Sequence, residues 1–332
     1  MSTIVTQPNA TTSHFARPLT DFAVNWGNEQ NYFVAGDAFS LRSVRKQQDR
    51  FYKYNRADLL RNTAHLRADG TEARISEFSL STDVYDIQVY STASVISDRT
   101  LLNQDEVLDL ATSKTRHVTE QLLIDREQRM VSELLTTGIW GTDWTGIDGA
   151  SPNTTQFTRW NSASSNPIKV IRDAIRHVHS RTGKRPNRML IGRTAFDALK
   201  DNSSVLDRIT GGSMVSNPAN VEKNLLASLF SLEQIHVMDA VANTGPAGGD
   251  EDTDLIGGND VLIYYAPASV GRDTATSVVL FAWTAFAGTG NNGLFIRRFR
   301  QEASMADVIE GNMAYQFKVV ANELGIFLNG VI

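Results

Sequence analysis

The sequence contains no cysteine in its 332 residues. The absence of cysteine excludes disulfides, a thiolate nucleophile and thiolate metal sites, and it suits folding in a reducing cytoplasm. No apolar run approaches the ~18 residues that span a bilayer, so we expect no membrane partner. The opening stretch, MSTIVTQPNATTSHF, has no basic segment followed by an apolar one, and we therefore expect no secretory signal.

The chain also lacks a strong positive charge. Its formal net charge is -5 and it has no lysine-rich tail, which argues against a dedicated nucleic-acid reader. Hydrophobic residues make up 41% of the sequence, enough to bury a substantial core, and we expect two domains plus extensions.

Proline and glycine are absent from residues 103–137. At about 1.5 Å per residue this stretch predicts one helix of roughly 50 Å, much longer than the helix of ~11–12 residues that is usual in globular domains. Asn103 is expected to cap its start, with Glu106 reaching back as in a capping box, and Gly138 to end it. Apolar residues recur at helical spacing on one side, whereas an a/d heptad does not persist. We interpret the stretch as an amphipathic helix lying across a sheet and not as a coiled coil.

The segments before this helix are polar and extended. Residues 1–30 are rich in Thr, Ser and Asn, so we expect them to be disordered or ordered by lying on another surface. The following section, to residue 56, interleaves basic and aromatic residues, which could bind single-stranded nucleic acid by stacking. We favour contact with neighbouring chains, because the basic residues thin out directly afterwards. Residues 57–82 contain the turn signal Asp69-Gly70 and few large apolar residues, which predicts a polar two-stranded loop that projects from the body.

From residue 167 the pattern changes to alternating helix and strand. Strands are expected at 84–89, 189–192, 235–238, 261–265 and 278–286, and in FKVVANELGIFL near the end. Helices are expected from 168 to near Gly183, at 195–200 and at 221–229.

Several motifs suggest chemistry without completing it. The segment GTGNNG at 288–293 matches GxGxxG but precedes LFIRRFR, which predicts a strand where a dinucleotide site needs a helix, so we interpret it as a turn. The acidic run at 250–254 has the first spacing of a calcium loop but lacks its glycine and final glutamate. His177 and His179 are two residues apart in a helix and cannot jointly hold a metal. Asp125, Glu127 and Glu133 are expected on a solvated or interface face. The sequence predicts no enzyme, no cofactor and no metal.

Taken in order, a set of segments identifies a family resemblance. The segments are a polar arm, VRKQQDRFYKYNRADLLRN, RADGTEARI, VISDRTLLN, TEQLLIDREQRMVSELLTTGIWG and SNPIKVIRDAIRHVHSRTGKRPNRMLIGRTAFDAL. Together they resemble the major capsid proteins of tailed bacteriophages, from about Phe15 onward. The resemblance implies an α+β chain with the Hong Kong 97-type coat fold, which encapsulin shells share.

The resemblance assigns a part to each region. It implies an N-terminal arm at 1–54, an extended β-loop at 55–83 and a peripheral domain at 84–166 with a spine helix at 103–137. It implies an axial α/β domain at 167–287 and a C-terminal segment at 288–332 that completes the sheet. Because only a short polar arm precedes the body, we expect a separate scaffolding protein or none.

The implied function is that of a structural subunit which self-assembles, as hexamers and pentamers, into an icosahedral capsid. The expected partners are further copies, a portal, a scaffolding or decoration protein, and packaged double-stranded DNA without sequence specificity. Assembly is expected in the host cytoplasm and the final location in the virion. An encapsulin-like compartment and a nucleotide-binding enzyme remain as alternatives.

Charged residues of the extended loop are the candidates for contacts between subunits. Exposed pairs of this kind contribute only about 0–1 kcal/mol each, so we expect assembly to depend on their number and on aromatic anchors. The candidates are Arg61, Arg67, Arg74, Glu72 and Glu77.

Overall fold

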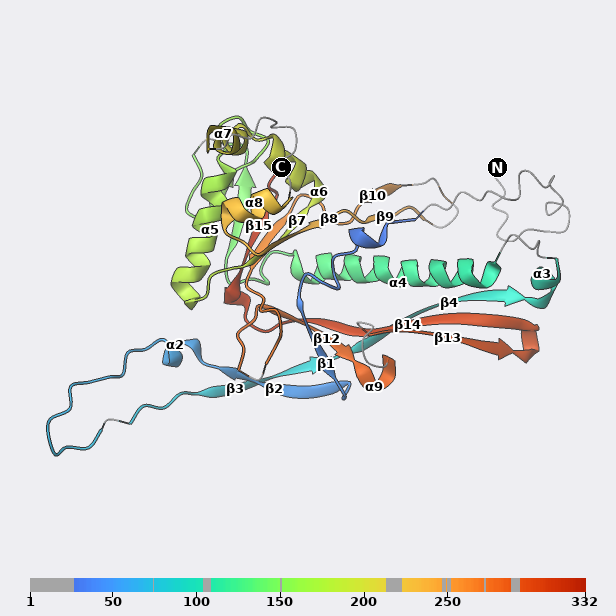
Figure 1. The fold of residues 1–332 in the computed structure, drawn as a ribbon, viewed down its shortest axis with the longest axis horizontal. Helices are drawn as coiled ribbons and strands as arrows, with labels where there is room; N and C mark the ends of the chain where they lie inside the picture. Colours follow the sequence, from blue (N-terminus) through green and yellow to red (C-terminus); the bar gives the residue numbers. More distant parts are fainter. Residues whose placement is uncertain are drawn as a thin grey trace.

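The computed structural model describes residues 27–73, 75–103, 109–149, 151–212, 223–246, 249, 252–271, 273–287 and 293–332. Viewed down its shortest axis, the chain is elongated, with a projecting loop at one end and the far end of a long helix and sheet at the other (Figure 1). Two sheets form the body between them.

The first sheet has six strands in the order β6-β5-β15-β11-β7-β8. The strands are β5 (Asp143–Ile147), β6 (Gln156–Thr158), β7 (Arg188–Gly192), β8 (Gln234–Met238), β11 (Val261–Tyr264) and β15 (Gly325–Asn329). The accompanying helices are α5 (Pro167–Thr182), α6 (Arg193–Asp201), α7 (Ser203–Gly212) and α8 (Lys223–Phe230). We call this sheet with its helices the six-stranded half.

Both faces of the six-stranded sheet are covered. Val261 and Ile263 of β11 pack in the cluster formed with the helices, while Leu262 and Tyr264 pack in a second cluster on the opposite face. This alternation follows the two-residue period of a strand. It explains why the run VLIY of the predicted strand is apolar throughout.

The second sheet has five strands and includes the longest strand, β14 (Ala306–Val319). One edge of β14 pairs with β12 and β13, the other with β4, and β1 lies parallel to β12. The other strands are β1 (Ser40–Val44), β4 (Gln88–Ser97), β12 (Val278–Trp283) and β13 (Leu294–Gln301). Helix α4 lies over this sheet (Figure 1), and we call the two together the long-helix half.

Helix α4 touches the backbone of β14 at Gly311. A Cβ atom at this glycine would lie 2.5 Å from Val118 Cγ1 and 2.8 Å from Leu122 Cδ1. Since real Cβ atoms do not approach so closely, only glycine lets the helix lie this near the strand.

The long helix is shorter than predicted. Helix α4 spans Leu110–Leu134 and its N-terminal cap is Asp109, whose carboxylate accepts from the Thr112 amide at 3.1 Å. Asn103 instead ends a separate short helix, α3 (Asp98–Leu102), and donates its side-chain amide to the Arg99 carbonyl. Residues 104–108, which include the predicted capping-box Glu106, lie outside the described residues. The expectation of one unbroken helix from residue 114 to 128 is confirmed.

The C-terminal end of α4 is set by a tertiary contact. The indole Nε1 of Trp140 donates to the Leu134 carbonyl at 2.7 Å, and both residues are buried. The chain therefore leaves the helix before Thr137, although Gly138 does have the positive φ (+88°) expected of a residue past a helix end.

The remaining elements are short. They are the hairpin of β2 (Gln48–Tyr54) with β3 (Leu80–Asp86), the hairpin of β9 (Val241–Asn243) with β10 (Thr253–Leu255), helices α2 (Arg56–Leu59) and α9 (Thr284–Ala287), and 3-10 turns at Gln30–Tyr32, Glu302–Ser304 and Asn322–Leu324.

Three strand predictions need correction. The strand expected at 84–89 is divided at Ile87, because β3 ends at Asp86 in the β2–β3 hairpin and β4 begins at Gln88 in the five-stranded sheet. The strand expected at 278–286 ends at Trp283, where α9 begins. The segment FKVVANELGIFL is not one strand, because the 3-10 turn Asn322–Leu324 separates the end of β14 from β15, and these strands belong to different sheets. Among the described residues, no helix is long and apolar enough to cross a membrane.

Candidate functional site

A loop projects from the β2–β3 hairpin, and residues 55–79 form it. It extends away from the body at the end opposite the far end of α4 (Figure 1). Gly70 takes a φ of +74° at the tip, as the Asp69-Gly70 turn signal predicted. The described residues between α2 and β3 contain no strand, so the predicted two-stranded structure is limited to the β2–β3 base. The loop therefore owes little of its shape to hydrogen bonds between its two limbs.

The loop exposes large apolar side chains. Leu66 is 103% and Ile75 84% exposed, and Phe78 is 55% exposed. Leu59 and Leu60 at the loop base are also exposed. Sequence analysis had described the loop as poor in large apolar residues and missed this feature. Full burial of a Leu or Ile side chain contributes about 1.5–3 kcal/mol, more than an exposed ion pair, so these residues are the stronger candidates for contacts with another protein surface.

The predicted charged candidates are not brought together within one chain. Arg61, Arg67, Glu72 and Glu77 are all exposed, and none forms an ion pair with another described residue. Arg67 donates through Nε to the Thr71 carbonyl, which stabilises the tip locally. The fifth candidate, Arg74, lies outside the described residues.

The base of the loop is attached to the body of its own chain. The Tyr54 hydroxyl donates to Asp273 at 2.9 Å, which raises the pKa of that tyrosine, and Arg56 forms an ion pair with Glu323. Ser79 donates both its hydroxyl and its amide to Asp58 and thereby lowers the pKa of that carboxyl. A groove of about 740 Å³ lies between the loop base and the body.

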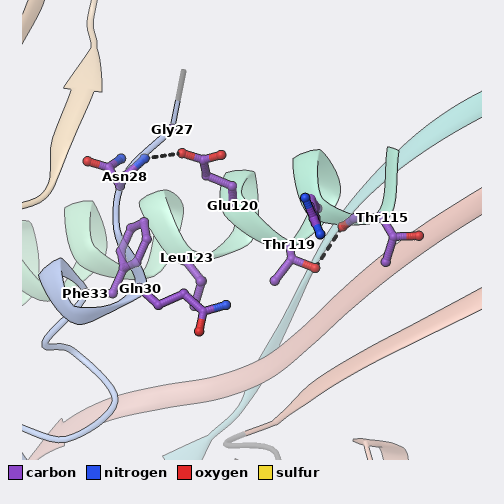
Figure 2. Close-up of a pocket in the computed structure, with 9 residues that line it drawn as sticks. Gly27, Asn28, Gln30, Phe33, Thr115, Thr119, Glu120 and Leu123 are labelled. Atoms are coloured by element: carbon purple, nitrogen blue, oxygen red, sulfur yellow. Dashed lines mark hydrogen bonds between the residues drawn. The ribbon is translucent and has the colours of Figure 1, made fainter. Parts of the chain in front are cut away.

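A second feature is the N-terminal strap, residues 27–39, which lies along α4. The amide of Asn28 donates to Glu120 at 2.7 Å (Figure 2), and the amide of Ala35 donates to Glu127 at 2.6 Å. The two residues of each pair are 92 positions apart in sequence. The strap therefore runs parallel to α4, and both segments advance by seven residues between the two contacts. A pocket of about 300 Å³ opens between the strap and the helix near Glu120 (Figure 2).

The strap also binds the β9–β10 hairpin and the six-stranded half. The side-chain amide of Asn28 donates to the Val241 carbonyl at 3.0 Å and accepts from the Val241 amide at 3.0 Å. Further along, the Ala38 carbonyl accepts from Arg188 Nη1 at 2.9 Å and from the Tyr264 hydroxyl at 2.5 Å. The strap therefore links the two halves before β1 enters the five-stranded sheet.

Glu127 is buried, which corrects the expectation of a solvated or interface face. Glu127 is 1% exposed, and burial raises the pKa of its carboxyl to about 7. The amides of Ala35 and Val34 and the charge of Arg126 oppose this rise. A sequence signal was available, because Glu127 interrupts an otherwise apolar row on the helix formed by Leu123, Met130 and Leu134.

The motifs that suggested chemistry do not form a reactive centre in the described part of the chain. Gly293 is followed directly by strand β13, and residues 288–292 lie outside the described residues. The ring of His177 packs edge-on against Trp144 while His179 is exposed. Asp252 and Asp254 are exposed, and Asp250 lies outside the described residues. Among the described residues, no three His, Asp or Glu side chains lie close enough together to hold a metal ion.

Comparison with known proteins gives matches in sequence and in fold. Residues 146–273 match the family of phage major capsid protein E. The major capsid protein of Burkholderia phage BcepMu is 24% identical over 251 residues, which are 74% of this chain and 75% of that protein.

Solved structures match almost the whole chain. A phage-related protein of Bordetella bronchiseptica RB50 has a TM-score of 0.66 at 15% identity and covers 92% of this chain and 94% of its own. The capsid of cyanophage P-SCSP1u has a TM-score of 0.60 at 13% identity, with 93% and 90% covered. An encapsulin of Synechococcus elongatus PCC 7942 matches less closely, with a TM-score of 0.51 at 10% identity and 93% and 92% covered. The predicted α+β Hong Kong 97-type fold is confirmed.

Proposed function

We infer that the chain is a phage major capsid protein with the Hong Kong 97-type fold, and that its work is to build a closed shell from many copies of itself. The observation that carries this inference is the projecting loop, whose apolar side chains are left exposed by the described residues of their own chain. Its family and relatives are structural capsid proteins and not enzymes.

The physical basis of assembly is the burial of these loop residues on a neighbouring copy. Leu66 and Ile75 are almost fully exposed, and exposed apolar side chains of this size favour association. The contacts at Tyr54 and Arg56 fix the loop base on the body, so that the apolar residues are presented before a partner arrives. Preorganisation of this kind reduces the entropy lost on binding.

The regional assignments follow from this function. We propose residues 1–54 as the arm, 55–83 as the extended loop, 84–166 with α4 as the peripheral domain, 167–287 as the axial domain and 288–332 as the C-terminal segment. β12 lies within the axial range but belongs to the five-stranded sheet, so the two domains exchange a strand at this boundary.

Finer parts of the proposal concern the assembled particle. We propose hexamers and pentamers as its units, a portal and a scaffolding or decoration protein as partners, assembly in the host cytoplasm, and double-stranded DNA as the contents. The charged loop residues Arg61, Arg67, Arg74, Glu72 and Glu77 would pair across subunits and set the register of the loop.

An encapsulin-like compartment is the second candidate, since an encapsulin shares the fold. A sequence relative matched over 251 residues is a phage major capsid protein, which favours the phage function. Particles with enclosed protein and without DNA would support the compartment instead.

The test is to shorten the loop. Deletion of residues 62–76 is expected to leave a folded subunit, since none of these residues belongs to a core cluster, but one that forms no closed shells in negative-stain electron microscopy. Normal shells from the shortened chain would contradict the proposal.

A matched pair of variants separates apolar from charged contacts. Leu66→Ser with Ile75→Ser is expected to prevent shell formation, whereas Arg61→Gln with Glu77→Gln is expected to slow it and to reduce its dependence on salt. The reverse ranking would show that the charges dominate.

A further inference from the structure

Helix α5 presents a strongly basic face in an acidic chain. Residues 167–185 contain six lysines and arginines and one aspartate, while the whole chain has a formal net charge of -5. All six basic residues are exposed. They are Lys169, Arg172, Arg176, Arg181, Lys184 and Arg185. The apolar residues of α5 face the core of the six-stranded half, so this charge lies on the outer side of the helix.

The chain itself neutralises little of this face. Asp173 is its one carboxylate and pairs with both Lys169, at 3.2 Å, and Arg176, at 3.0 Å. Arg181 donates to the neutral hydroxyl of Thr142 at 3.1 Å. Arg172 has no ion pair with any described residue. The face therefore carries several positive charges that a partner could pair.

The β9–β10 hairpin carries the opposite charge. Residues 241–255 contain four acidic residues and no lysine or arginine, and the sequence at 250–254 is DEDTD. Asp252 and Asp254 are exposed and form no ion pair with another described residue. Asp250 and Glu251 lie outside the described residues.

The two charged surfaces lie on opposite sides of the six-stranded half (Figure 1). In Figure 1, which looks down the shortest axis, α5 lies on the side of the projecting loop, and β9–β10 extends in the direction of α4. A side-by-side contact that repeats by rotation would bring the α5 side of one copy to the β9–β10 side of the next. Such a head-to-tail contact closes into a ring when the rotation closes.

We propose that the basic face of α5 binds the acidic β9–β10 hairpin of the adjacent copy in each ring. This inference rests on the proposed shell function and assigns to it a contact between neighbours. The neighbour that receives the projecting loop also supplies the hairpin, because loop and α5 point to the same side. Exposed charge pairs act mainly on orientation and association rate, so the contact selects the correct neighbour and disfavours contact between two identical faces.

Cysteine cross-linking tests the contact directly, because the natural chain has no cysteine. Arg176→Cys combined with Asp252→Cys is expected to give, on mild oxidation of assembled shells, a ladder of linked chains that ends at the ring size. The matched control, Arg176→Cys combined with Glu302→Cys at the distal turn of the β13–β14 hairpin, is expected to give no ladder. If the first variant forms shells of wild-type appearance but gives no ladder, the ring contact alone is overturned. If the wild-type chain forms no shells, the proposed function is overturned.

Charge reversal provides the second measurement. Arg172→Glu with Arg176→Glu is expected to reduce the yield of shells at least tenfold at low salt, without a change in the thermal unfolding of the free subunit. Adding Asp252→Lys and Asp254→Lys to the same chain is expected to restore the yield. Normal shells that hold less DNA would instead assign the basic face to the packaged nucleic acid and overturn the proposal, as would a failure of the second pair to restore assembly.

Discussion

The buried Glu127 gives the sharpest prediction about stability. Its carboxyl has an ordinary pKa of 4.5, and burial raises this pKa to about 7 in the folded chain. Between these two values the folded chain holds a proton that the unfolded chain has released. Stability therefore falls as pH rises through this window, with its full contribution present below about pH 4.5. A shift of roughly 2.5 units corresponds to about 3 kcal/mol at 1.36 kcal/mol per unit.

The variant Glu127→Gln removes the titration. A glutamine side chain is close in shape and can still accept from the Ala35 amide, which lies 2.6 Å from the carboxylate. Below about pH 7 the wild-type carboxyl is itself protonated, so the variant removes an anion beside Arg126 only at higher pH. The pH dependence is the diagnostic quantity: the difference in unfolding free energy between wild type and variant should change by about 3 kcal/mol between about pH 4.5 and 7.5.

Urea unfolding of unassembled subunits, followed by tryptophan fluorescence, measures this difference. The control is Glu120→Gln, on the same helix and also an acceptor for a strap amide, but less buried. The Glu120 variant measures the effect of replacing a carboxylate that accepts from a strap amide. An equal pH dependence in wild type and Glu127→Gln would refute the argument, because the strap and helix would then hold no unusual proton.

Three further predictions concern other parts of the fold. Burial lowers the pKa of His236 from 6.5 to about 4, so the stability of the folded chain increases as pH rises between these values. The variant His236→Leu should remove about 3 kcal/mol of this increase in unfolding free energy, measured by urea unfolding. An unchanged increase in the variant would contradict the prediction. Gly311→Val places a side chain where Val118 and Leu122 already lie, and it should lower the unfolding free energy by about 1–3 kcal/mol in thermal melts, whereas an unchanged melting temperature would show that the helix can move aside. Tyr54→Phe removes the hydrogen bond to Asp273 and should increase hydrogen exchange and proteolysis at the loop base without changing the melting temperature; equal exchange in both chains would mean that the ion pair of Arg56 fixes the base alone.

The long helix was predictable in kind but not in extent. The absence of proline and glycine and the apolar spacing indicated it correctly. Asn103 and Asp109 are both good caps, and local sequence does not decide between them. At the other end the helix stops because the indole of Trp140, six residues beyond Leu134, donates a hydrogen bond to the Leu134 carbonyl. That contact depends on tertiary packing, which no local pattern contains.

The site was predicted in position but not in chemistry. The turn at Asp69-Gly70 located the projecting loop correctly, because the backbone of this turn is encoded locally. The importance of Leu66 and Ile75 was missed, since two apolar residues in a polar stretch look unremarkable until their full exposure is known. The burial of Glu127 was missed because its partners are backbone amides of the strap, 92 residues away, and backbone amides leave no mark in the sequence.

The placement of β14 and β15 has a consequence for synthesis on the ribosome. β14 pairs with three strands of the five-stranded sheet, and β15 lies between β5 and β11 in the other sheet, yet both follow every other strand in chain order. A nascent chain that has not reached residue 329 lacks an interior strand of the six-stranded sheet, and one that ends before residue 306 lacks interior strands of both. Neither sheet can close until these strands emerge, so the pairing that defines the subunit follows translation. We therefore expect chains terminated before residue 306 to lack the finished surfaces of both sheets and to be excluded from a growing particle.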